Sequence, residues 1–96
     1  MSSYTISKRN SGVIELSITT QSNAYIRLQD MGDNIYCAIT TFVDPSLRGK
    51  GIGRKLYKAL IEFVRDTKVK FSATCPFIVK LAESDKTITD IYLKSN

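Results

Sequence analysis

Apolar and polar residues alternate along the first third of the chain. The segments YTISKR (residues 4–9), GVIELSIT (12–19) and NAYIRLQD (23–30) either alternate between the two kinds or are rich in β-branched residues. A period of two residues is typical of a strand with one buried face. The pattern therefore predicts three strands, and their short connections predict antiparallel pairing.

A fourth strand is predicted at IYCAITTFV, residues 35–43, after the turn signal MGDN. Its nearly continuous apolar character is typical of a strand covered on both faces, and Cys37 is interpreted as a core residue. Strict alternation predicts one face made by Ile35, Cys37, Ile39, Thr41 and Val43, and the other by Tyr36, Ala38, Thr40 and Phe42.

Helical spacing begins after Asp44 and Pro45 and predicts an amphipathic helix over about 51–66, packed on the sheet. The apolar positions of this helix are Ile52, Leu56, Ala59, Leu60 and Phe63. A short strand is predicted at 69–74, and Pro76 then opens a second, short helix over about 76–84. Residues 87–93 are interpreted as a last strand or extended segment.

This order of elements predicts one α+β domain over residues 1–96. The unit made of the fourth strand, the long helix and the next strand should be parallel, because a helix connects its two strands. Together with the earlier strands, it gives a mixed, mostly antiparallel sheet with one main helix.

Charge is distributed unevenly along the chain. The net charge is +5, and the segment 45–61 holds five basic residues and no acidic one, whereas basic and acidic residues balance elsewhere. An excess of positive charge in one segment favours an anionic partner, although solubility alone is an alternative explanation. The five basic residues are Arg48, Lys50, Arg54, Lys55 and Lys58.

The sequence also bears on compartment and metal content. No apolar run approaches the roughly 20 residues of a membrane span, and MSSYTISKRN lacks the apolar stretch of a signal peptide. Histidine is absent and the two cysteines are far apart, which argues against a metal site. We therefore expect a cytoplasmic protein with reduced thiols, no metal and no membrane partner.

Three glycines, Gly49, Gly51 and Gly53, coincide with the basic segment at the start of the predicted helix. A helix N-terminus presents free N–H groups and a partial positive charge, and glycines let a phosphate approach it. The spacing matches neither the P-loop nor the dinucleotide-binding fingerprint. The sequence thus predicts a phosphate site of another kind.

The motif R-x-x-G-x-G at residues 48–53, with VDP before it and RKLYKALIEFVRD after it, resembles that of the GNAT acyltransferase superfamily. The later CPF at 75–77 and the ending DIYL look like the small stand-alone members of that superfamily. The resemblance covers roughly residues 23–93 and implies a GNAT-like fold, acetyl-CoA as co-substrate and acetyl transfer to an amine.

The resemblance also implies a set of coenzyme A-binding residues. The amides from Lys50 to Arg54 would hold the pyrophosphate, and the backbone from Phe42 to Asp44 would pair with the pantetheine arm. Arg54, Lys55 or Lys58 could reach the 3′-phosphate. The whole implied set is Phe42, Val43, Asp44, Arg48, Gly49, Lys50, Gly51, Ile52, Gly53, Arg54, Lys55 and Lys58.

Two residues are candidates for the chemistry. Cys75 precedes Pro76 at the expected N-cap of the short helix, where a thiol ionises more easily. It could be a nucleophile, a base or an acid toward the departing thiolate, or alternatively a small buried residue. Related small proteins often carry His-Thr where this chain has Thr40 and Thr41, which makes Thr40 the second candidate.

Other requirements of the reaction are met less clearly by the sequence. A bulge near Phe42 and Val43 could supply the N–H group that the oxyanion needs. The tyrosine that many GNAT enzymes use as an acid has no counterpart in the second helix, so Tyr57 or Tyr92 could serve only if folding brings one close.

Three functions remain open at this point: an acetyltransferase, an acetyl-CoA-binding domain without turnover, and a small basic RNA-binding domain. The basic segment contains a single aromatic residue, Tyr57, which makes nucleic acid an unlikely partner. Because little chain separates the second predicted strand from the third, the acceptor side should be open or completed by a second copy. An open site suits a peptide end, a lysine side chain or a polyamine, in a monomer or a homodimer.

Overall fold

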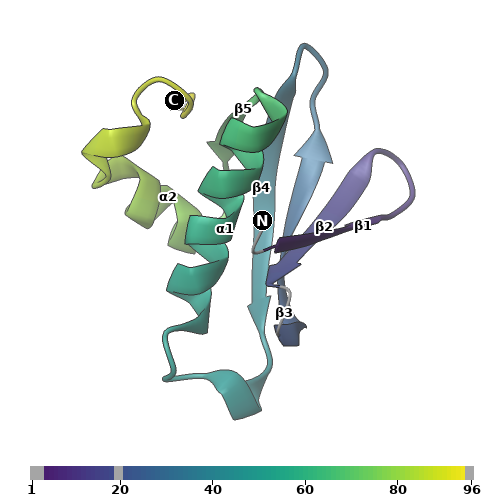
Figure 1. Ribbon diagram of the computed structural model, residues 1–96, viewed down its shortest axis with the longest axis vertical. Helices are drawn as coiled ribbons and strands as arrows, with labels where there is room; N and C mark the ends of the chain where they lie inside the picture. Colours follow the sequence, from purple (N-terminus) through teal and green to yellow (C-terminus); the bar gives the residue numbers. More distant parts are fainter. Residues whose placement is uncertain (1–3, 19–20, 95–96) are drawn as a thin grey trace.

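The computed structural model describes residues 4–18 and 21–94 (Figure 1). In this part the chain forms five strands, two α-helices and two 3-10 helices. These elements are β1 (Tyr4–Lys8), β2 (Val13–Ile18), β3 (Gln21–Asp30), β4 (Ile35–Val43), η1 (Pro45–Leu47), α1 (Ile52–Thr67), β5 (Lys70–Ala73), α2 (Pro76–Glu83) and η2 (Lys86–Ile88).

The five strands form one sheet in the order β1-β2-β3-β4-β5. Neighbours from β1 to β4 are antiparallel, and β4 and β5 are parallel, with α1 between them in the chain. The predicted α+β fold with a mixed, mostly antiparallel sheet is therefore confirmed. Both helices agree with their predicted ranges of 51–66 and 76–84 to within one residue at each end.

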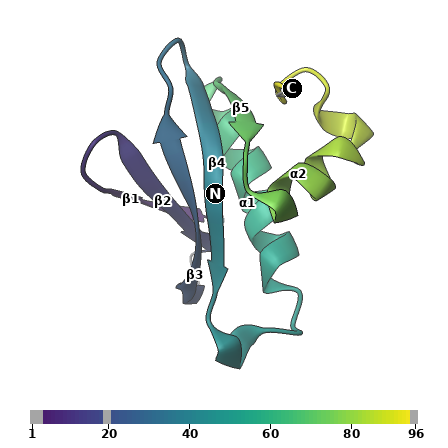
Figure 2. The same ribbon diagram turned by 180° about the vertical axis from the view of Figure 1, so that it is seen from behind.

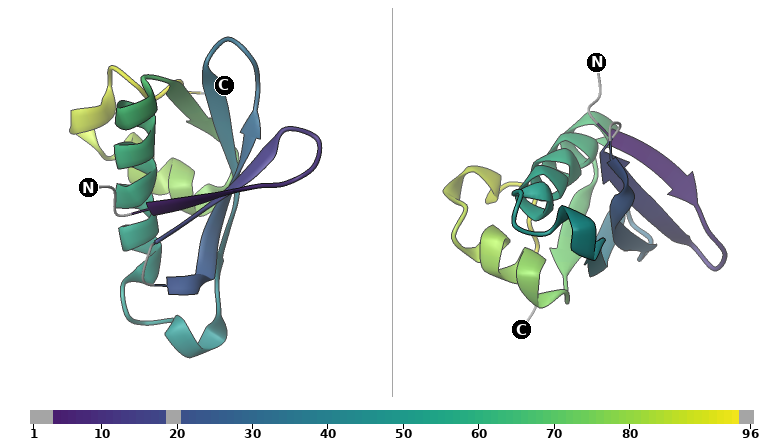
Figure 3. Two further views of the ribbon diagram at one scale, coloured as in Figure 1. Left: turned by 45° about the vertical axis from the view of Figure 1, so that its right-hand side comes forward. Right: turned by 90° about the horizontal axis from the view of Figure 1, so that it is seen from below.

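Both helices lie on the same side of the sheet, whose other face carries no helix among the described residues (Figure 3). Every apolar position predicted for α1 is buried, from Phe63 at 6% exposed to Leu56 and Leu60 at 0%. These side chains share one hydrophobic cluster with Ile26 and Leu28 of β3. No helix in the described part of the chain has both the length and the apolar character to span a membrane.

A β-bulge interrupts the pairing of β3 with β4. Arg27 pairs with Thr40 and the next β3 residue, Leu28, pairs with Ala38, which leaves Ile39 as an extra residue in β4. One extra residue reverses the faces on which all later side chains of the strand lie. The sequence suggested a bulge near Phe42 and Val43. The observed bulge, at Ile39, lies before that segment.

The prediction of strictly alternating faces along β4 is therefore wrong beyond Ala38. Thr41 pairs with Ile26, a fully buried residue of the helix-covered face, so its side chain also points to that face. Thr40 and Phe42 instead point to the uncovered face of the sheet. The apolar pattern could not reveal this change, because every residue from 35 to 43 is apolar, aromatic or threonine.

Cys37 lies before the bulge and pairs with Gln29 of β3. It is buried as predicted, with 7% of its surface exposed, but it is not part of the main hydrophobic cluster. Its neighbours in β4, Tyr36 and Ala38, belong to that cluster or pack against it. Cys37 therefore lies on the opposite face of the sheet.

The C-terminal segment joins the sheet at one point. Tyr92 forms a parallel bridge with Phe71, and Phe71 exchanges backbone hydrogen bonds with Ile91 and Leu93. The predicted strand or extended segment at 87–93 is thus right near Tyr92 but wrong at its start, where η2 and a turn replace it. The bridge places the end of the described chain beside β5.

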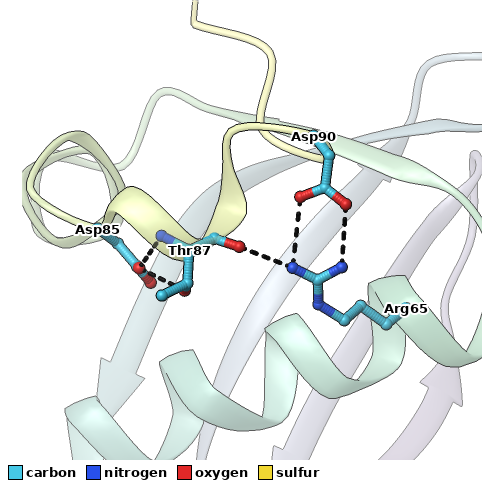
Figure 4. Close-up of polar contacts among 4 residues, drawn as sticks. All are labelled: Arg65, Asp85, Thr87 and Asp90. Carbon is cyan, nitrogen blue, oxygen red and sulfur yellow. Dashed lines mark hydrogen bonds and ion pairs between the residues drawn. The ribbon is translucent and has the colours of Figure 1, made fainter.

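Side chains fasten this C-terminal segment to α1 (Figure 4). The Arg65 guanidinium forms an ion pair with the Asp90 carboxylate at 3.1 Å and donates to the Thr87 carbonyl oxygen at 2.8 Å. Asp85 caps η2 by accepting from the Thr87 backbone N–H at 2.9 Å and from its hydroxyl at 2.6 Å. The Arg65 contacts hold Thr87 and Asp90 against the C-terminal end of α1.

Candidate functional site

A groove of about 410 Å³ lies where the end of β4, the loop before α1, and the first turns of α1 and α2 meet. Its walls combine backbone from the glycine-rich loop with apolar and basic side chains. The residues that line it are Thr41, Val43, Leu47, Arg48, Gly49, Gly51, Ile52, Gly53, Arg54 and Phe77.

The groove follows a gap between β4 and β5. The two strands pair only from Ile35 to Ala38 on β4, and β5 ends at Ala73, beside the middle of the longer strand (Figure 2). The Ala38 carbonyl oxygen accepts from the N–H groups of Thr74 and Cys75 at 3.0 and 3.1 Å, where the chain turns away into α2. Residues 39–43 therefore have no partner in β5.

The N-terminus of α1 lies at one end of the groove and is unusual in its capping. Gly51 occupies the N-cap position, no side chain caps the helix, and the first turn contains no acidic residue. Arg54 and Lys55 instead place positive charge where the helix dipole is already positive. A bound anion would satisfy the free N–H groups and relieve this repulsion.

The three glycines of the motif have two different structural roles. Gly49 and Gly51 have φ angles of +82° and +74°, and a Cβ atom on either would meet nothing within 4 Å. Their backbone conformation favours glycine and leaves open space beside the loop. Gly53 has no such φ angle, but a Cβ atom there would lie 2.8 Å from Cζ of Phe77. Gly53 therefore leaves room for the Phe77 ring where α2 approaches α1.

Cys75 is the N-cap residue of α2, as predicted, and only 7% of its surface is exposed. Its thiol donates a hydrogen bond to Oγ1 of Thr41, with a sulfur–oxygen distance of 3.4 Å. Burial raises the pKa of the Cys75 thiol, but once the sulfur is ionised the Thr41 hydroxyl and the backbone N–H groups of Ile78, Phe77 and Thr41 can donate to it, and these hydrogen bonds outweigh burial and lower the pKa. The Cys75 thiol is therefore easier to ionise than an ordinary cysteine thiol.

Most of the implied coenzyme A-binding residues surround the groove. Arg48 donates from Nε to the Val43 carbonyl oxygen at 3.3 Å, so its side chain folds back across the loop. Of the twelve implied residues, those that line the groove are Val43, Arg48, Gly49, Gly51, Ile52, Gly53 and Arg54.

The remaining candidates lie elsewhere. Phe42 stacks on Tyr25 over the uncovered face of the sheet, with ring centroids 5.3 Å apart. Asp44 caps η1 and accepts from the Ser46 N–H at 2.9 Å. Thr40 is exposed on the uncovered face, so the structure brings Thr41 to Cys75 rather than Thr40. Residues that are exposed to solvent without lining the groove are Lys50, Lys55 and Lys58.

A second cleft, of about 620 Å³, adjoins the groove through Arg54, which lines both. It lies between α1 and the chain from Leu81 to Thr87, with Lys58 on its α1 side. Tyr57 donates from its hydroxyl to the Asp85 carboxylate across this cleft at 2.8 Å. Burial and this hydrogen bond raise the pKa of Tyr57, which makes it a poor proton donor.

Sequence reasoning missed three groove residues: Thr41, Leu47 and Phe77. Phe77 belongs to the CPF segment, but its contact with Gly53 depends on the packing of α2. The sequence could not distinguish Thr41 from Thr40, because only the bulge decides which of the two faces the groove. Leu47 lies in η1, between the strand and the motif, where no sequence signal marked it.

Comparisons with known proteins agree with this geometry. Residues 13–91 match the family model of the GCN5-related N-acetyl-transferases. Among solved structures, the NMR solution structure of a GCN5-like protein from Staphylococcus aureus superimposes with a TM-score of 0.66 at 28% sequence identity, covering 100% of this chain and 94% of that one. No curated protein sequence matches the chain.

Proposed function

The chain belongs to the GCN5-related N-acetyltransferase family, and we propose that it uses acetyl-CoA to acetylate an amine acceptor. The observation that carries this proposal is the groove, which connects the uncapped N-terminus of α1 to the surroundings of Cys75. In acetyl-CoA the pantetheine arm joins the pyrophosphate to the thioester. In such a groove the pyrophosphate would lie at the α1 end and the thioester at the Cys75 end.

The residues present suit coenzyme A. The pyrophosphate would be held by the free N–H groups at the start of α1, beside Gly49 and Gly51, with Arg48 and Arg54 supplying charge. The pantetheine arm contains two amide groups, and residues 39–43 of β4, which have no partner on the β5 side, offer backbone groups to pair with them. The acetyl group would then lie near Thr41 and Cys75.

The second cleft suits the rest of the cofactor. Lys58 and Arg54 provide positive charge for a 3′-phosphate, and Ile61 and Leu81 provide apolar surface for a nucleoside. Lys55 does not line this cleft, so among the three basic residues considered from the sequence the geometry favours Arg54 and Lys58.

Acetyl transfer requires a neutral amine and a group that assists the leaving thiolate. A lysine-type amine has a pKa of about 10.4, so roughly one molecule in a few thousand is neutral at pH 7. Cys75 is the one reactive side chain that the structure brings to the described groove region with a lowered pKa. The Tyr57 hydroxyl already donates its hydrogen bond to Asp85, and the Tyr92 ring packs on Phe71 with ring centroids 5.1 Å apart.

Two routes through Cys75 follow from this chemistry. In the covalent route, the thiolate attacks the thioester carbon, and coenzyme A leaves as a thiolate that takes a proton. The neutral amine then attacks acetyl-Cys75, loses one proton to become the amide, and releases Cys75 as the thiolate. In the direct route, the amine attacks the thioester itself and loses its proton, while the Cys75 thiol protonates the departing thiolate. The backbone N–H of Thr41 faces the Cys75 sulfur and would have to turn from it to donate to an oxyanion in either route.

The acceptor would be a peptide terminus, a lysine side chain or a polyamine. The uncovered face of the sheet leaves room for a large acceptor on the side away from the helices (Figure 3). Exposed aromatic and apolar side chains on β4, Phe42 and Ile39, are 38% and 36% exposed. These surfaces favour a peptide over a polyamine, because polyamines need carboxylates more than apolar contacts.

The decisive experiment measures free coenzyme A released from acetyl-CoA in the presence of peptides, lysine derivatives and polyamines. Thermal unfolding with and without acetyl-CoA reports binding separately, because a ligand of the folded state raises the melting temperature. The variant Arg54→Gln should lose most of this rise, whereas the control Lys70→Gln, on β5 and outside both cavities, should keep it.

Three outcomes separate the candidate functions. Release of coenzyme A with an amine supports the acetyltransferase. A thermal shift with acetyl-CoA, but no release of coenzyme A with any acceptor, indicates an acetyl-CoA-binding domain without turnover. The absence of any shift at millimolar acetyl-CoA would refute the proposal.

A further inference from the structure

The contact between Thr41 and Cys75 joins residues 34 positions apart in the chain. Thr41 comes from β4 and Cys75 from the start of α2, on the two sides of the gap that lies beyond the β4–β5 pairing. Thr41 lines the groove and Cys75, which is buried, lies behind it, so this contact links the groove wall to the sulfur. Neither the family match nor the sequence motif assigns a role to this threonine.

We infer that Thr41 is a positioning residue whose hydroxyl holds the Cys75 sulfur at the groove, in the orientation that the reaction needs. This inference rests on the proposed acetyl transfer for its function, but the contact itself is a property of the fold. It applies to both routes, since each requires the sulfur to face the thioester.

The bulge at Ile39 is what aims Thr41 at Cys75. In a regular strand, Thr41 would lie on the face opposite to Ala38, and Thr40 would take its place. The extra residue turns Thr41 toward the helix-covered face, where it pairs with buried Ile26. A bulge beside a reactive group commonly serves to re-aim one side chain.

The hydroxyl can hold the sulfur in both protonation states. The neutral thiol donates to Oγ1 of Thr41 at 3.4 Å. When the thiol ionises, rotation of the hydroxyl allows it to donate to the thiolate instead. The backbone N–H groups of Thr41, Phe77 and Ile78 act on the same sulfur, so the thiolate has donors from both β4 and α2.

Substitutions of Thr41 separate a positioning role from simple space filling. Thr41→Val keeps the shape of the side chain and removes the hydroxyl, whereas Thr41→Ser keeps the hydroxyl and removes a methyl group. A packing role predicts that valine is tolerated and serine is the more damaging change. A positioning role predicts the reverse.

The first measurement is the rate at which iodoacetamide alkylates Cys75 as a function of pH, with mass spectrometry to distinguish it from Cys37. Thr41→Val should shift the profile to higher pH and slow alkylation at pH 7 by about tenfold, as expected for the loss of a hydrogen bond to a charged group. Thr41→Ser should stay within about threefold of the wild type. Urea unfolding of both variants controls for folding.

The second measurement is steady-state acetyl transfer with the best acceptor found. Thr41→Val should lower kcat while KM for acetyl-CoA changes little, and Thr41→Ser should restore kcat. A wild-type pH profile for folded Thr41→Val would overturn the inference, as would a serine variant as impaired as the valine variant. If the profile shifts as expected but the wild type releases no coenzyme A, the acetyltransferase proposal fails and the positioning of Cys75 by Thr41 stands.

Discussion

Gly53 offers a quantitative test of how α1 and α2 meet, through the substitution Gly53→Ala. Replacing glycine by alanine inside a helix stabilises it by at most about 1 kcal/mol. The new Cβ atom would, however, lie 2.8 Å from Cζ and 3.1 Å from Cε2 of Phe77, closer than atoms pack without movement. Overpacking of this kind costs about 1–3 kcal/mol. Because Phe77 is 39% exposed and its ring can yield, we expect the lower end of that range.

The two terms should therefore nearly cancel in the wild type, and the free energy of unfolding of Gly53→Ala should change by less than about 1 kcal/mol. When Phe77→Ala removes the ring, only the helix term remains, and Gly53→Ala should stabilise the protein by about 1 kcal/mol. For a domain of this size that gain corresponds to roughly 4–8 °C in melting temperature.

Urea unfolding of the four proteins in this double-mutant cycle, followed by circular dichroism, measures the coupling directly. The expected coupling between the two positions is about 1 kcal/mol or more. Gly49→Ala is the matched control: its φ angle of +82° makes alanine unfavourable by roughly 1–2 kcal/mol, and the absence of any neighbour predicts no coupling to Phe77. An effect of Gly53→Ala that is the same with and without the Phe77 ring would refute the reasoning.

Three further predictions concern the second cleft and the sheet. Tyr57→Phe should cost about 1 kcal/mol of stability, through loss of the hydrogen bond to Asp85, and leave the rate of coenzyme A release unchanged; a large fall in that rate would make Tyr57 catalytic. Wild-type protein should bind coenzyme A about tenfold more tightly than dephospho-coenzyme A, and isothermal titration should show this preference shrinking in Lys58→Gln; an unchanged preference would place the 3′-phosphate elsewhere. The pKa of Glu15 is lowered mainly by hydrogen bonding from Arg9, against burial, so its stabilising contribution is complete above the unfolded-state pKa of about 4.3 and is lost as pH falls through the lower folded-state value. Unfolding curves across pH 2–7 should accordingly show a shallower loss of stability in acid for Glu15→Gln, and parallel curves for the two proteins would contradict this assignment.

Secondary structure was largely predictable because its signals are local. The period of two before residue 30 and the helical spacing from Ile52 to Phe63 each reflect burial of one face, and each element formed where its pattern indicated. The exception is the start of the segment 87–93, where Asp85 caps a 3-10 helix through Thr87. That short-range capping outweighed the β-branched composition of the segment.

The position of the glycine-rich loop was predictable for the same reason, since the motif from Arg48 to Gly53 is contiguous in the chain. Its surroundings were not. Lys58 and Asp85 line the same cleft because the C-terminal segment packs beside α1, where Arg65 pairs with Asp90. Contacts between distant segments depend on packing and leave no periodic trace in the sequence.

By itself, then, the sequence determined the type and order of the elements and the position of the glycine-rich loop, because these follow from burial and backbone freedom over short stretches. The tertiary structure alone decided which threonine meets Cys75 and why a side chain at position 53 would press against Phe77. The first depends on a single extra residue, Ile39, that changes the faces of β4, and the second on the Phe77 ring that α2 brings to α1. Both are decided by the register and packing of segments that are separate in the chain.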